Sequence, residues 1–116
     1  MAAVKIREIS NLDGTNYIFW SKRMRDHLIS LGFDVWASVF YGYAMPKTAP
    51  SILEAKKSYE NNFTALKAIL GGLEFSEFVK VMNYYTSKEV WDKLQGVYKG
   101  ASKVQQAKLQ AYRAQF

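Results

Sequence analysis

The pattern of hydrophobic positions along the chain predicts a series of short amphipathic helices. From Tyr17 to Leu31, apolar residues recur at spacings of three and four, with polar residues mostly between them. This spacing places the apolar side chains on one helix face. Gly32 follows, and glycine is common just beyond a helix end. Because no window alternates as a surface strand does, we expect an all-α fold, a compact bundle of five to six short helices.

The other helix boundaries follow from capping and turn residues. Thr15 or Asn16 can cap the first helix, because a side-chain oxygen there accepts hydrogen bonds from its free N–H groups. Thr86 and Glu89 form a capping box, which marks a later helix start. The further helices that we expect run from Val35 to about Phe40 after an Asp34 cap, from after Ser51 to Leu70, over about 74–84, and from Thr86 up to Gly100.

The same spacing predicts which side chains form the core. Trp20 and Trp91 lie on the apolar faces of the first and fifth helices, so we assign both to the core. The expected buried face of the third helix is Ile52, Tyr59, Phe63, Leu66, Ile69 and Leu70, and that of the fourth is Phe75, Phe78, Val81 and Met82.

The last predicted helix, after a second capping-box pattern at residues 102–105, is apolar on two sides. One side carries Leu109, Tyr112 and Phe116, and the nearly opposite side carries Val104, Ala107, Ala111 and Ala114. A helix of this kind usually packs between two partners. We therefore expect three parts: an N-terminal segment over residues 1–15, a helical domain over 16–100, and a C-terminal helix over 101–116 that leads toward a second domain or docks on a partner.

The composition agrees with one folded domain. Of 116 residues, 49% are hydrophobic, which is enough to bury a core and excludes a disordered chain. No segment approaches the roughly 20 apolar residues that a membrane-spanning helix needs. The first residues also lack the apolar stretch of a signal peptide. We therefore expect an intracellular, cytoplasmic protein with no membrane partner.

Residue types that carry catalysis or bind metals are scarce. The chain has no cysteine, and His27 is its one histidine, so thiol nucleophiles and Cys- or His-based zinc sites are excluded. No nucleophile motif accompanies His27. Glu74 and Glu77 could pair as carboxylates, but a helix start explains them without catalysis. We expect no enzymatic activity, no cofactor, no metal and no small-molecule substrate.

Aromatic and basic residues supply two candidate binding surfaces. Tryptophan and tyrosine are enriched in protein interfaces. The self-association candidates are Trp36, Tyr41, Tyr43, Tyr84, Tyr85, Tyr112 and Phe116. The net charge of +6 permits weak contact with nucleic acid. Lys22, Arg23 and Arg25 are the nucleic-acid candidates, and loop tyrosines could stack on bases.

Four motifs in order resemble the Gag polyproteins of copia-type LTR retrotransposons. The first is L-D-G-T-N-Y at residues 12–17, with Trp20 and Met24 after it. The others are V-W at 35–36 followed by Gly42-Tyr43 and Pro46, A-L-K-A-I-L at 65–70, and T-S-K-E-V-W-D-K-L at 86–94 followed by Tyr98. The closing residues Val104, Lys108, Leu109 and Phe116 are similar to the family's next segment, so the resemblance covers about residues 10–116.

The resemblance implies a helical, non-enzymatic domain like the N-terminal part of a retrotransposon capsid. Such domains associate with copies of themselves into particles that package the element's RNA. In complete polyproteins, a second capsid domain and often a CCHC zinc knuckle follow. Because this chain has no cysteine, it lacks the knuckle, and its own contact with RNA should be weak and salt-dependent.

The leading hypothesis is therefore a self-associating Gag module whose partner is another copy of itself. Two alternatives stay open: a basic RNA-binding module, and a domesticated Gag-derived adaptor that binds a cellular protein. An active element's Gag and a host-derived copy share the same motifs, so the sequence supports both origins equally.

Overall fold

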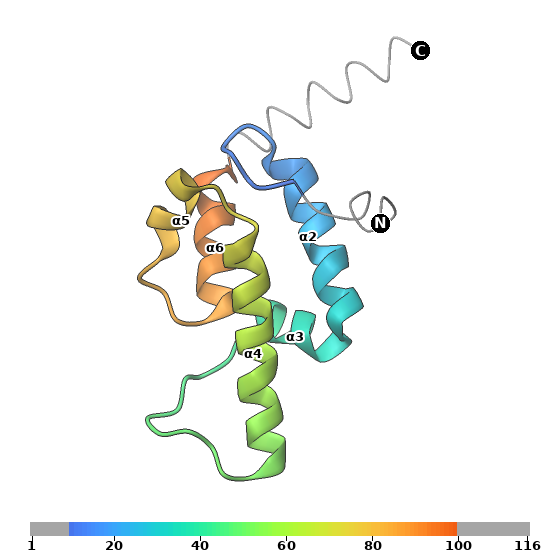
Figure 1. The fold of residues 1–116 in the computed structure, drawn as a ribbon, viewed down its shortest axis with the longest axis vertical. Helices are drawn as coiled ribbons and strands as arrows, with labels where there is room; N and C mark the ends of the chain where they lie inside the picture. Colours follow the sequence, from blue (N-terminus) through green and yellow to red (C-terminus); the bar gives the residue numbers. More distant parts are fainter. Residues whose placement is uncertain (1–9, 100–116) are drawn as a thin grey trace.

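The computed structural model describes residues 10–99, which form an all-α bundle (Figure 1). Its helices in this part of the chain are α2 Tyr17–Leu31, α3 Phe33–Tyr41, α4 Leu53–Gly71, α5 Phe75–Val81 and α6 Ser87–Val97. The long helix α4 contacts α2, α3 and α6, and α5 packs on α6. The expected fold class is confirmed. The helix expected over residues 101–116 lies outside the described part.

The core is built from the apolar faces that the helical spacing predicts. Trp20 is only 2% exposed, its indole N–H donates to the Gly72 carbonyl at 3.0 Å, and its ring stacks on Trp91 with centroids 5.9 Å apart. The core position of Trp20 is confirmed. Trp91 is half-buried and packs against the core from its margin.

Helix α2 has the expected bounds, but the expected side-chain cap is wrong. Asn16 is the N-cap residue and makes no side-chain capping bond to α2. Its amide is used in the preceding loop, where Oδ1 accepts from the Asp13 N–H at 3.2 Å and Nδ2 donates to the Asn11 carbonyl at 3.0 Å. The Asn16 side chain therefore stabilises the loop that leads into α2 and does not cap the helix.

Helix α3 also differs from the expectation at its start. It begins at Phe33 with Gly32 as its N-cap, so Asp34 is not the cap. Asp34 instead lies in the first turn, where a carboxylate interacts favourably with the partial positive charge of a helix N-terminus.

The loop before α2 closes one end of the bundle. Leu12 is fully buried; its N–H donates to the Gly72 carbonyl at 2.8 Å, and its carbonyl accepts from the Glu74 N–H at 3.0 Å. Gly14 has φ +98°, which favours glycine, and a Cβ at this position would lie 3.4 Å from the Tyr98 hydroxyl. The Leu12–Tyr17 motif therefore has a structural role in closing the domain.

A buried carboxylate lies beneath this loop. Glu77 of α5 is 3% exposed and accepts hydrogen bonds from the Tyr98 hydroxyl and, at 3.1 Å, from Lys80 Nζ. The Lys80 ammonium also lies 5.3 Å from the centre of the Tyr98 ring. The hydrogen bond to Glu77 raises the pKa of Lys80, and burial followed by the Glu77 contact raises the pKa of Tyr98.

The buried side of α5 is only partly as expected: Val81 is fully buried and Phe78 packs against the core, as expected, but Glu77 is buried as well. The buried side of the helix is Glu77 and Val81, whereas Phe75 and Met82, expected inside, are 78% and 52% exposed. The helix also ends at Val81, before the expected limit near residue 84. The cause is that Glu77 has two hydrogen-bond partners, the buried Tyr98 hydroxyl and the ammonium of the exposed Lys80, which offset the cost of its burial.

Helix α4 is rotated slightly from its expected face by a buried amide. Asn62 is fully buried, and its Oδ1 accepts from the Ser87 N–H at 2.9 Å and the Ser87 hydroxyl at 3.0 Å, at the start of α6. Accordingly Phe63, expected inside, is 39% exposed, and Ile52, which precedes the helix, is 70% exposed. One helix thus supplies part of the cap of another.

Alkaline pH should weaken the fold through Tyr17. Burial, with a smaller contribution from the Asp92 charge, raises the pKa of Tyr17 from 10.0 to about 12. The folded state therefore favours the neutral phenol, and the resulting stability is present below pH 10 and is lost as the pH rises to about 12. We expect the urea midpoint to fall over this window. The Tyr17→Phe variant should show a smaller fall of the urea midpoint. An equal fall in the variant and the parent would contradict Tyr17 ionisation as the cause.

Candidate interaction surface

Aromatic rings form a continuous path from the core to the surface at α3. Trp91 meets Trp36 edge to face at 5.5 Å between centroids, and Trp36 stacks on Phe40 at 6.3 Å. Phe40 then meets Tyr41 at 5.0 Å. Exposure rises along this path to 55% at Phe40 and 78% at Tyr41. We call Trp36, Phe40, Tyr41 and Trp91 the α3 aromatic surface.

Local geometry fixes the outer end of this surface. Trp36 and Phe40 are four residues apart on α3 and so share one helix face. Gly42 ends the helix with φ +93°, and the Lys88 stem from α6 lies so close that a Cβ at Gly42 would come within 2.9 Å of it. Lys88 Nζ in turn pairs with Asp92 at 2.6 Å. The backbone at the end of α3 is thereby held against α6 at Gly42.

A polar cavity adjoins Tyr41 between α3 and α4. Its volume is about 410 Å³, and its lining includes Asp34, Glu54 and Lys57 beside Tyr41. The aromatic surface therefore has a rim with charges of both signs, which is the usual composition around the centre of a protein interface.

The other self-association candidates are distributed over the bundle. Tyr43 is half-buried against Tyr59, with ring centroids 6.4 Å apart. Tyr84 is half-buried and packs against the core, whereas Tyr85 beside it is 71% exposed. The ring contacts thus bring Trp36 and Tyr41 together through Phe40. Tyr112 and Phe116 lie outside the described residues.

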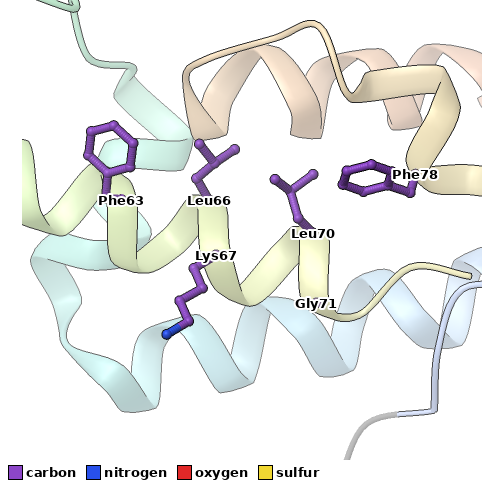
Figure 2. A pocket seen from close by; sticks show the side chains of 6 residues that line it. All are labelled: Phe63, Leu66, Lys67, Leu70, Gly71 and Phe78. Atoms are coloured by element: carbon purple, nitrogen blue, oxygen red, sulfur yellow. The ribbon is translucent and has the colours of Figure 1, made fainter. Parts of the chain in front are cut away.

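A second apolar feature is a groove between α4 and α5, shown in Figure 2. Its volume is about 490 Å³. The residues that line it are Phe63, Leu66, Lys67, Leu70, Gly71 and Phe78. Neither Phe40 nor this groove was predicted as a binding feature. The available signal for Phe40 was its spacing of four from Trp36, whereas the groove depends on the rotations of α4 and α5.

The basic candidates lie on the outer face of α2. Lys22, Arg23 and Arg25 are all exposed, and Arg25 pairs with Asp26 at 3.4 Å. In Figure 1, α2 lies on the opposite side of the bundle from the α5–α6 connection, which carries Tyr84 and Tyr85. The basic run and these tyrosines therefore do not form one joint surface.

The described residues contain neither a metal-binding cluster nor a membrane-spanning helix. Across residues 10–99, no group of three or more His, Cys, Asp or Glu side chains could hold a metal ion. Within the same range, no helix has both the length and the apolar character needed to cross a bilayer. His27 is exposed on α2, and Glu74 is exposed while Glu77 is engaged with Tyr98, so these two carboxylates do not act as a pair.

A comparison with known protein families identifies the family of this chain. The family model for the gag-polypeptide of LTR copia-type matches residues 24–116. This chain belongs to the copia-type Gag family. Its role is accordingly that of a retrotransposon Gag structural polypeptide. The L-D-G-T-N-Y motif precedes the matched range. The chain matches no curated protein and no solved structure.

Proposed function

We propose that this Gag domain self-associates through its α3 aromatic surface and so builds an intracellular particle that packages the element's RNA. The main support for the proposal is the exposure of Phe40 and Tyr41, which lie at the outer end of a series of ring contacts that begins at the core. A folded monomer gains nothing from leaving Tyr41 78% exposed, whereas a partner surface would remove the ring from water.

The arrangement suits a contact that is weak and repeated. Because Trp36 packs between Trp91 and Phe40, the inner rings of this surface lose little side-chain freedom when a partner binds. The surface is small, so a single contact should dissociate readily and wrong placements in a growing particle can be corrected. Tyr43, Tyr84, Tyr85, Tyr112 and Phe116 stay candidates for further contacts between copies.

Substitution of Tyr41 tests the proposal with little risk to the fold. We expect Tyr41→Glu to lower the association constant of the full chain roughly thirtyfold, as for loss of an interface residue worth about 2 kcal/mol. Sedimentation velocity over a range of concentrations measures it. Phe19→Glu is the matched control, since Phe19 is a 60% exposed aromatic on α2. Equal association by both variants and the parent would refute this surface.

The basic face of α2 supports RNA as a second partner. Each of Lys22, Arg23 and Arg25 can neutralise one phosphate. On single-stranded RNA, three such contacts contribute about −2 to the slope of log affinity against log salt concentration, so their loss should make this slope less steep by about 2. We expect the triple alanine variant to show this reduced slope in a filter-binding titration. An unchanged slope would place the RNA contact elsewhere on the chain.

A further inference from the structure

The groove between α4 and α5 is lined by apolar side chains: Leu66 forms its floor at 8% exposure, and Phe63, Leu70 and Phe78 are only partly covered by the described residues. Figure 2 shows Phe63, Leu66 and Leu70 projecting from one side of α4, with Phe78 of α5 beside Leu70. Lys67 leaves α4 on the other side, so the row itself is apolar. Phe63 is 39% exposed.

The apolar surface continues past the groove onto α5. Phe75, Val79 and Met82 recur at helical spacing and are 78%, 43% and 52% exposed. They lie outward because Glu77 and Val81 take the inner side of the helix. The apolar area at this edge of the bundle is therefore wider than the groove alone, as expected of a surface that another element covers.

One side of the predicted C-terminal helix matches this row in spacing. Phe63, Leu66 and Leu70 follow the pattern i, i+3, i+7, and Leu109, Tyr112 and Phe116 follow the same pattern. At a rise of about 1.5 Å per residue, each row is about 10 Å long. Two such rows can pack side by side, with contacts at Phe63 and Leu70 on either side of the buried Leu66, as the ridges and grooves of packed helices do.

We infer that the α4–α5 groove of one copy receives the 109–116 segment of a second copy. This inference rests on the proposed self-association and names the contact that extends it. A groove and a distant segment are different patches of the chain, so their pairing is heterologous. Each copy then offers one free groove and one free segment, and assembly can continue beyond a dimer. A contact between two α3 aromatic surfaces closes at two copies when it is symmetric.

Two full-length variants separate the groove from the segment. Phe63→Glu disables the groove and keeps the segment, whereas Tyr112→Glu does the reverse. The sequence has no cysteine, so one cysteine introduced at exposed Gln95 gives a single site for donor and acceptor dyes. Energy transfer between the dyes then reports two kinds of affinity. One is that of the mixed pair, in which Phe63→Glu associates with Tyr112→Glu; the other is that of each variant with a second copy of itself, the same-variant pair. Phe19→Glu and Gln110→Glu are the matched controls, and thermal melts verify folding; Phe63→Ala replaces Phe63→Glu if the latter melts early.

The mixed pair should associate at least tenfold more tightly than either same-variant pair, because it alone retains one intact groove and one intact segment. Any contact through the α3 aromatic surface is present in all pairs and cancels in this comparison. Equal affinities of all pairs, with the parent still associating, would overturn the groove contact alone, and docking of the segment on its own copy gives this result. A parent chain that stays monomeric would overturn the proposed function as well.

Discussion

Replacement of Trp20 by alanine is expected to lower the free energy of unfolding by about 3–5 kcal/mol, the typical cost of truncating a buried aromatic residue. The ring is 2% exposed and stacks on Trp91, and its N–H bonds the Gly72 carbonyl at 3.0 Å. The substitution removes all three contributions and leaves a cavity where α2, α4 and α6 meet. Small domains have about 5–15 kcal/mol in total, so a large share of the stability would be lost.

Two further variants assign this loss to its causes. Trp20→Phe keeps an aromatic ring and removes the hydrogen bond, so it should cost less than Trp20→Ala. Phe19→Ala, at a neighbouring but exposed position, should change the stability by no more than about 0.5 kcal/mol. Urea unfolding followed by far-ultraviolet circular dichroism measures all three. A Trp20→Ala variant as stable as the parent would show that the bundle is not packed around this residue.

The second large effect is expected at Tyr98, where truncation to alanine should also cost about 3–5 kcal/mol. Tyr98 is 7% exposed, and its ring stacks on Tyr17 with centroids 5.2 Å apart. Its hydroxyl donates to the buried Glu77 carboxylate. Tyr98→Ala therefore removes a core ring and takes from a buried charge one of its partners, which adds to the packing loss.

The contribution of the hydroxyl can be separated from that of the ring. Tyr98→Phe keeps the ring, so the cost should fall to about 1–3 kcal/mol, the range for a buried group that loses a hydrogen-bond partner. In a double-mutant cycle with Glu77→Gln, the two costs should not add, because both variants change one contact. Tyr85→Ala, at a 71% exposed tyrosine, is the matched control. Additive costs in the cycle would refute the Glu77–Tyr98 contact.

The helices of this domain were predictable because their signals are local. Apolar spacing and Gly32 defined α2 to its end residues. The capping box placed the start of α6, where the Thr86 hydroxyl oxygen accepts from the Glu89 N–H at 3.4 Å and donates to the Glu89 carboxylate at 2.6 Å. Each of these signals acts within a few residues, so no knowledge of the tertiary fold was needed.

Spacing correctly predicted Leu66, Ile69 and Val81 as buried, but it did not predict the complete buried faces of α4 and α5, because polar residues occupy central positions there. Asn62 is buried to bond Ser87, which is 25 residues away, and Glu77 is buried to bond Tyr98. Hydrophobic periodicity treats both as surface residues. These long-range contacts turn Phe63 and Phe75 outward and so create the apolar groove and its margin, which the sequence alone did not indicate.

The candidate interaction residues were predictable by type and not by grouping. The enrichment of tyrosine and tryptophan in interfaces identified Trp36 and Tyr41 as candidates, and the structure adds Phe40 between them. The contact of Trp36 with Trp91 depends on how α3 and α6 pack, which no local pattern encodes.

Light scattering by the full chain, free of RNA and at increasing protein concentration, tests self-association most directly. The mass should rise steadily with concentration at both low and high salt, because apolar and aromatic contacts depend little on ionic strength. A mass that stays at the 13.3 kDa of one chain at all concentrations, and rises only when RNA is added at low salt, would contradict self-association and favour RNA binding.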